Sequence, residues 1–101
     1  HGGESIVTLT VDAARNRVFC GDREVVLSRI EYRLLSYLAR HRGFVMTNNQ
    51  LIDHVWPDAD MGDHHLLHST VNRLRRKLRD MANGEQYVIT RRGIGYGIGV
   101  K

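Results

Sequence analysis

The sequence has one cysteine, one proline and no long apolar run. Cys20 has no second cysteine to pair with, so no disulfide can form within the chain, which agrees with a reducing cytoplasm. No hydrophobic stretch reaches the length that spans a bilayer, and the opening residues HGGES lack the apolar region of a signal peptide. We expect a cytoplasmic protein without membrane contact, in which residues 1–4 are a linker or cloning remnant and residues 5–101 form one domain with Cys20 in its core.

The sequence also lacks the motifs of common catalytic and metal sites. It contains no glycine-rich phosphate loop after an expected strand, no GxSxG and no HExxH. His64, His65 and His68 have spacings that could approach one metal ion, with His54 and Asp63 nearby, but no cysteine joins them, and exposed histidines are the favoured interpretation. We therefore expect no enzyme activity, no cofactor and no metal.

Charge is unevenly distributed along the chain. The formal net charge is +4 and the pI is about 9.7, a mild indication of a polyanionic partner. Residues 72–92 contain seven basic side chains and only two acidic ones, whereas residues 53–63 contain four acidic side chains and no Lys or Arg. Because these neighbouring segments carry charge of opposite sign, we expect each of them to make a different contact.

The first part of the chain predicts three short strands. Residues 5–11, SIVTLTV, alternate and are rich in β-branched side chains, and residues 16–20 and 23–27 flank a Gly-Asp turn. The domain is therefore expected to open with a small antiparallel sheet.

Two capping boxes predict where the first two helices begin. Ser28 and Thr47 are each followed, three positions later, by a Glu or a Gln, so that both side chains can satisfy free backbone N–H groups. Apolar residues follow each box at helical spacing, and Gly43 and Pro57 end the two helices.

A third helix is expected from about Asp63 to Met81. It carries an apolar stripe on one side and polar or basic residues on the other: Leu67, Val71, Leu74 and Leu78 on the stripe, and His65, Ser69, Asn72, Arg73 and Arg76 opposite it. A helix of this diameter fits the major groove of B-DNA, where guanidinium groups can pair with guanine and with phosphate. The same charge run could also be an ordinary solvated face.

A hairpin is expected near the end of the chain, with strands at residues 87–90 and 96–100. Arg91 and Arg92 lie at its tip, and alternate glycines from residue 93 to residue 99 indicate a thin ribbon. The return strand is expected to place one apolar face on the core, formed by Ile94, Tyr96, Ile98 and Val100. An arginine on such a tip could reach a minor groove, so the basic helix and the basic hairpin together favour DNA binding.

The chain resembles the effector domain of OmpR/PhoB-type response regulators over roughly residues 7–100. The similarity lies in three motifs, LSRIEYRLLSYLARHRGFVMTNNQLIDHVW (27–56), VNRLRRKLR (71–79) and VITRRGIGYGI (88–98), in this order and spacing. It implies an α+β winged helix-turn-helix with a four-stranded N-terminal antiparallel sheet, a three-helix core and a C-terminal β-hairpin wing. It also implies bacterial transcription regulation by sequence-specific binding to double-stranded DNA, with a second copy alongside on promoter direct repeats.

The resemblance further implies which residues make the contacts. Arg73 would read a base, Arg75 and Arg76 would contact the DNA backbone, and Arg92 would be the wing arginine. Other polar and aromatic positions complete the DNA-binding set: Ser69, Thr70, Asn72, Thr90 and Tyr96. The acidic loop at residues 57–62 resembles the segment that meets RNA polymerase, with contacts expected at Asp58, Asp60, Met61 and Gly62.

Three positions depart from the usual pattern of this family. His68 stands where an acidic residue often helps to read bases, Arg91 where an apolar residue is usual, and Gly97 where a long polar residue is common. The operator sequence is therefore not implied. The receiver domain of a two-component regulator is absent from these residues, which favours a fragment of a larger protein. Two alternatives stay open: a winged-helix protein-interaction module, and the DNA-binding domain of a one-component regulator.

Overall fold

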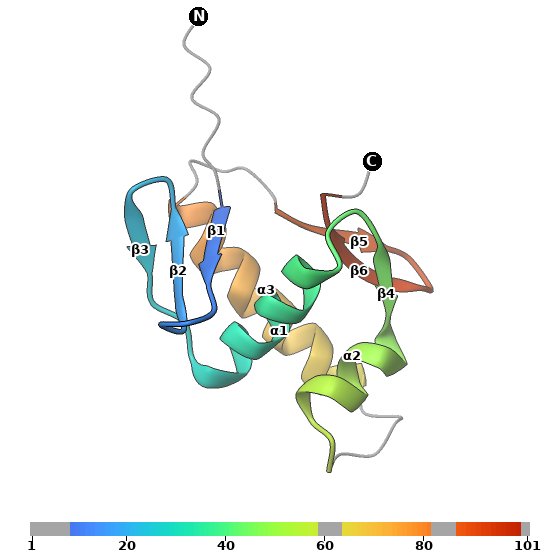
Figure 1. Cartoon of the computed structure of the whole chain (residues 1–101). Coiled ribbons are helices and arrows are strands. Elements are labelled where there is room, and N and C mark those ends of the chain that lie inside the picture. Colours follow the sequence, from blue (N-terminus) through green and yellow to red (C-terminus); the bar gives the residue numbers. More distant parts are fainter. Residues whose placement is uncertain (1–8, 59–63, 82–86, 100–101) are drawn as a thin grey trace, which may run out of the picture.

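The computed structural model describes residues 9–58, 64–81 and 87–99, with the backbone alone for residues 79–81. Three helices lie between two small antiparallel sheets (Figure 1). In chain order the elements are β1 (Leu9–Asp12), β2 (Arg17–Cys20), β3 (Arg23–Val25), α1 (Arg29–Arg40), β4 (Val45–Thr47), α2 (Asn48–Val55), α3 (His64–Met81), β5 (Val88–Arg91) and β6 (Gly95–Ile98). The expected order of sheet, helices and hairpin is confirmed. None of the helices in the described part of the chain has the length and apolar character of a membrane-spanning segment.

The N-terminal sheet has the strand order β1-β2-β3 and buries one of its faces. Val18 pairs with Val25, and Val18, Cys20 and Val25 are 1%, 3% and 5% exposed. Cys20 is thus the core residue that the sequence predicts, and burial raises the pKa of its thiol. The described residues contain three of the four strands implied for this sheet, and residues 1–4 and 5–8 lie outside them.

Both capping boxes form as the sequence predicts. The backbone N–H of Glu31 donates to the Ser28 hydroxyl at 3.2 Å, and the Ser28 N–H donates to the Glu31 carboxylate at 2.9 Å. The same reciprocal pair joins Thr47 and Gln50 at 3.1 and 2.8 Å. These side chains satisfy backbone donors that helix geometry leaves free, and they fix the beginnings of α1 and α2.

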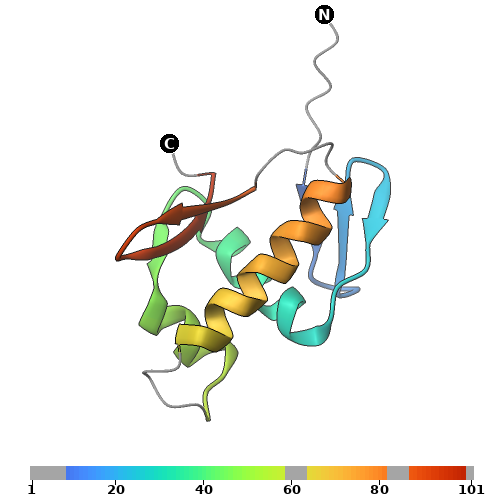
Figure 2. The same cartoon turned by 180° about the vertical axis from the view of Figure 1, so that it is seen from behind.

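The apolar stripe of α3 lies at the centre of the core. Each of its four residues is at most 1% exposed, which confirms the expected face: Leu67, Val71, Leu74 and Leu78. Leucine, isoleucine and valine side chains of α1 and α2 belong to the same buried cluster. Because α1 and α2 hold the stripe, the other side of α3 stays at the surface, as Figure 2 shows from behind.

The C-terminal hairpin belongs to a three-stranded sheet with the order β4-β6-β5. The sequence does not predict β4, which pairs with β6 so that Met46 lies opposite Tyr96 and Thr47 opposite Gly95. A Cβ atom on Gly95 would lie 1.8 Å from the Met46 carbonyl oxygen, so only glycine allows this approach. The hairpin, or wing, is thus joined by backbone hydrogen bonds to the segment that leads into α2.

The apolar face expected for the return strand is correct only in part. Tyr96 and Ile98 are 5% and 2% exposed, but Ile94 is 54% exposed because it lies in the turn before β6. Val100 lies outside the described residues. The wing is therefore held on the core by β6 itself, and its tip is more exposed than the spacing predicts.

Candidate nucleic-acid interface

The side of α3 opposite its apolar stripe is polar and basic, as the helical spacing predicts. Of the expected contact residues on this side, three are exposed and one is half-buried: Asn72, Arg73 and Arg76, and Ser69. Thr70 differs, because it is only 1% exposed and its hydroxyl donates to the Leu66 carbonyl at 2.8 Å. This position leaves Thr70 no surface for the phosphate contact expected of it.

Arg73 is held by two groups of the protein. Its Nη2 donates to the Thr70 hydroxyl at 3.3 Å, and its Nε lies 3.5 Å from a carboxylate oxygen of Glu31. Lys77, one helical turn along α3, lies 2.5 Å from the other oxygen of Glu31. One carboxylate, 2% exposed, thus caps α1 and binds Arg73 and Lys77 of α3, while the Arg73 side chain stays 55% exposed. The capping role of Glu31 is visible in the sequence, but its second role is not.

Glu31 remains ionised at neutral pH despite its burial. Burial raises the pKa of Glu31, because a carboxylate loses hydration inside the protein. Hydrogen bonds from Lys77 and from the Ser28 backbone, together with the charge of Lys77, outweigh this effect and hold the pKa below its ordinary value. The carboxylate therefore keeps its attraction for Arg73 and Lys77.

Arg75 joins α3 to the wing. Its Nε and Nη2 donate to the Val88 carbonyl at 3.1 and 2.9 Å, and Nη2 also donates to the Thr90 hydroxyl. Its guanidinium carbon lies 5.6 Å from the centre of the Tyr96 ring, within cation–π distance. The family resemblance implies that Arg75 contacts the DNA backbone, whereas the structure places Arg75 between α3 and the wing with Thr90 and Tyr96 as partners.

A cleft of about 310 Å³ lies between α3 and the wing. It brings together predicted contact residues of both elements, namely Asn72, Arg75, Thr90, Arg92 and Tyr96. His68 and Asn48 also line it, and the His68 ring meets Tyr96 edge-on at 6.0 Å. The contribution of Asn48 is not visible in the sequence, because the pairing of β4 with β6 brings the start of α2 to the cleft. Tyr96 is buried, and burial raises the pKa of its hydroxyl.

Arg92 is exposed at the tip of the wing. It directly precedes Gly93, whose φ of +77° lies in the region that favours glycine. The Ile94 N–H donates to the Arg91 carbonyl at 3.0 Å and closes the turn. Arg91 itself ends β5 and is half-buried. Of the two arginines expected at the tip, the more exposed one is thus Arg92, which the family resemblance assigns to the wing.

The expected polymerase loop is described only as far as Asp58, which is exposed. Its other three expected contacts, Asp60, Met61 and Gly62, lie outside the described residues. Trp56, which closes α2 just before this loop, is half-buried and packs against the core.

The histidines occupy separate surroundings. His54 of α2 stacks on Tyr37 of α1 with ring centres 4.1 Å apart, whereas His64 of α3 lies 3.4 Å from the side-chain oxygen of Asn49. Among the residues that the structure describes, no three His, Cys, Asp or Glu side chains gather in a metal-binding group.

Comparison with known proteins identifies the relatives of this chain. The model of a family described as transcriptional regulatory protein, C terminal, matches residues 22–98. The chain is similar to the DNA-binding domain of RstA from Klebsiella pneumoniae in complex with the RstA box, at 29% identity and a TM-score of 0.79, covering 94% of each chain. It is also similar to the DNA-binding domain of CpxR from E. coli, at 27% identity and a TM-score of 0.78, covering 94% of this chain and 93% of that one. The DNA-binding domain of the response regulator AdeR, in complex with an intercistronic region, gives 26% identity and a TM-score of 0.78 over 92% of this chain and 94% of that one. With its basic α3, its wing and this family match, the chain belongs to the C-terminal transcriptional regulatory family, the winged-helix effector domains of OmpR/PhoB-type response regulators.

Proposed function

We propose that this chain regulates transcription by binding specific double-stranded DNA, with α3 in the major groove and the wing tip in the adjacent minor groove. The observation that carries this proposal is one surface that runs from the exposed side of α3, across the cleft, to Arg92. The major groove admits a helix, and a narrow minor groove attracts arginine through its negative potential. Exposed Arg73, Arg76 and Arg92 supply cations to both grooves.

The exposed residues of α3 divide into two roles. We assign base reading to Arg73, because Glu31 and Thr70 restrict its guanidinium while leaving more than half of its side chain exposed. A restricted guanidinium loses less conformational entropy when it pairs with guanine. Arg76, Asn72 and Ser69 lie on the same side of α3, and we assign them to phosphate contacts that position the helix.

Arg75, Thr90 and Tyr96 are assigned to positioning instead of to DNA contact. The Arg75 guanidinium donates hydrogen bonds to the Val88 carbonyl and the Thr90 hydroxyl and lies over the Tyr96 ring. These contacts hold the wing at a fixed place beside α3. Thr70 is assigned a similar internal role beneath Arg73.

We also propose that two copies bind direct repeats in promoter DNA and that RNA polymerase meets the acidic loop that begins at Asp58. Asp58 and Asp60 of this loop would be repelled by phosphate, so the loop is expected to face away from DNA. Asp58→Lys should leave DNA affinity nearly unchanged and lower transcription in a reconstituted assay with polymerase. A loss of DNA binding in this variant would show that the loop lies against DNA, contrary to the proposal. This function places the protein in the bacterial cytoplasm.

The two alternative functions are less well supported. Charged residues are depleted from the cores of protein interfaces, so the exposed cations of α3 do not favour a protein-interaction module. Similarity to the DNA-binding domains of response regulators favours that class over a one-component regulator.

Selection from a pool of random duplexes tests the function directly. We expect enrichment of a direct repeat, and affinity for the selected site should fall with salt. Roughly four to six phosphate contacts give a slope of about −4 to −5 in a plot of log affinity against log salt concentration. A pool without enrichment, bound with no salt dependence, would refute DNA binding.

A further inference from the structure

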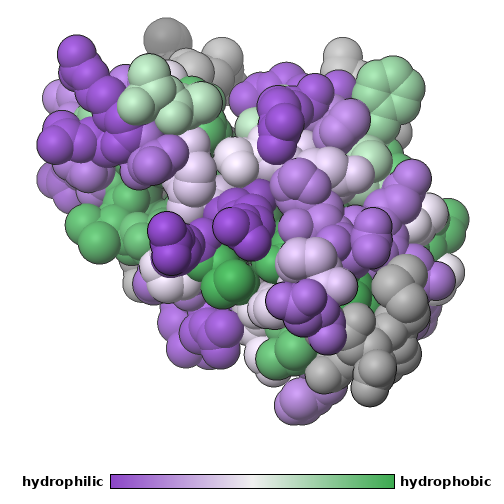
Figure 3. Space-filling model, turned by 60° about the horizontal axis from the view of Figure 1, so that its bottom comes forward, coloured by the Kyte–Doolittle hydropathy of each residue, from purple (hydrophilic) through white to green (hydrophobic). Residues whose placement is uncertain are grey.

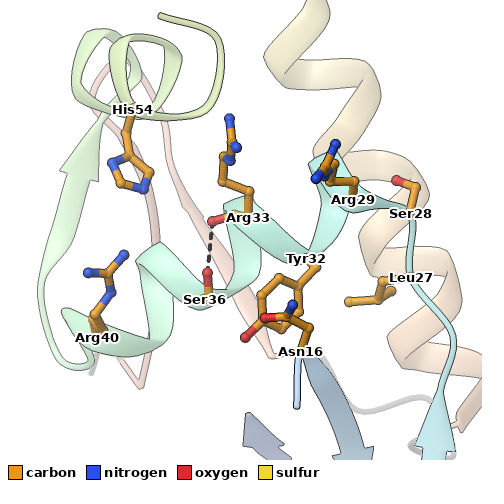
Figure 4. A pocket seen from close by; sticks show the side chains of 9 residues that line it. All are labelled: Asn16, Leu27, Ser28, Arg29, Tyr32, Arg33, Ser36, Arg40 and His54. Carbon is orange, nitrogen blue, oxygen red and sulfur yellow. Dashed lines mark hydrogen bonds between the residues drawn. The ribbon is translucent and has the colours of Figure 1, made fainter. Parts of the chain in front are cut away.

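A groove with basic walls runs along α1 on the face of the molecule away from α3. Two hollows of about 560 and 460 Å³ share Asn16, Tyr32, Ser36 and Arg40, so they form one groove between the β1–β2 turn and α2. Figure 4 shows the part of the groove next to α2, with α3 behind α1. Figure 1 has α1 in front of α3, and Figure 2, from behind, has α3 in front. DNA bound on α3 therefore leaves this groove open.

Three arginines of α1 line the groove on one side of the helix. Arg29, Arg33 and Arg40 are four and seven positions apart, which keeps them on one face over about 16 Å. His54 of α2 lies across from Arg40 in Figure 4. All three arginines are exposed, and within the described part of the chain none of them forms an ion pair with a carboxylate.

The stability of the fold explains two of these cations in part, because Arg33 donates to the Val55 carbonyl at 3.5 Å and Arg40 lies in the last turn of α1, where the helix dipole favours positive charge. It does not explain Arg29. Arg29 is the first residue of α1, where the helix dipole disfavours positive charge. Burial, and then the charges of Arg40 and Arg33, lower the pKa of His54, while Asp53 acts in the opposite direction. Positive potential is thus concentrated at the groove, and an anionic occupant would relieve it.

Part of the groove is apolar, beside the polar side chains of Asn16, Ser28 and Ser36. Leu27 and Tyr32 are half-buried and pack against the core, and Val11, Ala13 and Ala39 extend the apolar surface toward the N-terminal sheet. Figure 3, which brings the bottom of Figure 1 forward, shows a mostly hydrophilic face with hydrophobic side chains in small separate patches. A nucleic-acid backbone would use the cations alone, whereas an acidic peptide with one apolar side chain would use the cations and the apolar part.

We propose that this groove binds an acidic peptide segment of a partner protein. Its carboxylates pair with Arg29, Arg33 and Arg40, and one aliphatic or aromatic side chain covers Leu27 and Tyr32. The volume of the groove suits a single large anchoring side chain and its neighbours. Peptide and DNA can bind together, because they use different faces, and the peptide site does not depend on how DNA is read.

The test uses the 101-residue chain and a fluorescent synthetic peptide that carries glutamates on both sides of one phenylalanine. Arg40→Glu is compared with Arg23→Glu, a charge reversal of equal size on exposed β3, outside the groove. Arg40→Glu should weaken peptide binding about tenfold, because an attraction becomes a repulsion, while Arg23→Glu should change it less than about twofold. A peptide with serine in place of phenylalanine should also bind more weakly, and thermal melts confirm that both variants fold.

Three results would overturn the proposal. The first is a peptide that shows no saturable binding to the unaltered chain. The second is an equal loss in Arg40→Glu and Arg23→Glu, which would mean that only net charge matters. The third is a loss of affinity for random duplex DNA in Arg40→Glu, but not in Arg23→Glu, with peptide binding unchanged, which would make the groove a second nucleic-acid contact.

Discussion

Replacing Glu31 with glutamine tests the electrostatic link between α1 and α3 without removing a helix cap. Glutamine can close a capping box, as Gln50 does at the start of α2. A neutral amide cannot balance the cations of Arg73 and Lys77, which lie 3.5 and 2.5 Å from the carboxylate. The substitution therefore separates the charge of Glu31 from its capping role.

Two limits bracket the expected loss of stability. Exposed ion pairs contribute about 0.2–1 kcal/mol, whereas breaking a buried pair costs about 3–5 kcal/mol. Glu31 is 2% exposed, but the side chains of Arg73 and Lys77 are 55% and 42% exposed, so both cations can turn to water once the carboxylate is gone. We expect the free energy of unfolding to fall by about 1–3 kcal/mol, which lowers Tm by roughly 5–20 °C in a domain of this size.

Urea and thermal unfolding measure this loss, with Glu24→Gln as the matched control. Glu24 pairs with Arg17 at 4.0 Å between side chains that are 45% and 53% exposed. The same chemical change there should cost less than about 1 kcal/mol.

The pH dependence of stability gives a second check. Because the pKa of Glu31 is lowered on folding, its contribution is present above the unfolded-state pKa, near 4.5, and is lost as pH falls through the folded-state pKa. The difference in stability between the unaltered chain and Glu31→Gln should be constant near neutral pH and shrink below pH 4.5. A cost no larger than that of Glu24→Gln, or a difference that persists unchanged in acid, would refute the reasoning.

On DNA, Arg73→Ala should cost about 1–3 kcal/mol at the selected site and relax one base position, whereas Arg76→Ala should weaken specific and random duplexes alike. Titrations on both kinds of duplex check this, and equal effects of the two variants would contradict the assigned roles. Arg92→Ala should remove the preference for A·T over G·C flanks, while Arg91→Ala should mainly lower the salt slope; a flank preference unchanged in Arg92→Ala would make the wing a backbone clamp only. Gly95→Ala should destabilise the domain by about 3 kcal/mol or more, since its Cβ would meet a β4 carbonyl oxygen at 1.8 Å; an unchanged Tm would show that the wing can separate from β4.

The helices could be predicted from the sequence because their causes lie within a few residues of one another. Ser28 and Thr47 find their capping partners three positions away, and the α3 stripe repeats every three or four residues. The strand β4 has no such local cause. Its three residues form a strand because Met46 and Thr47 pair with Tyr96 and Gly95, far along the chain.

The candidate site also combines features that local spacing predicts with features that depend on tertiary contacts. Helical spacing predicts that Asn72, Arg73 and Arg76 are exposed, since this depends only on which side of α3 is packed. The surroundings of Thr70 and Arg75 depend on tertiary partners, and the family resemblance assigned both to DNA without showing that their polar groups are used inside the protein. Helical spacing alone places Thr70 and Arg75 on a basic helix. It does not show which residues of the wing or of α1 lie beside that helix.

In the proposed DNA complex, Arg75 and Gly95 would together fix the distance between the base pairs that α3 and the wing contact. Arg75 ties α3 to β5, and the close approach at Gly95 ties β6 to β4, so the wing is braced on two sides. Inserting one base pair between the two contacts moves the distal one by about 3.4 Å along the helix axis and turns it by about a tenth of a revolution. Neither α3 nor the wing can follow that displacement without breaking these internal bonds. An operator for this protein should therefore tolerate base substitutions between the two contacts far better than a change in their separation.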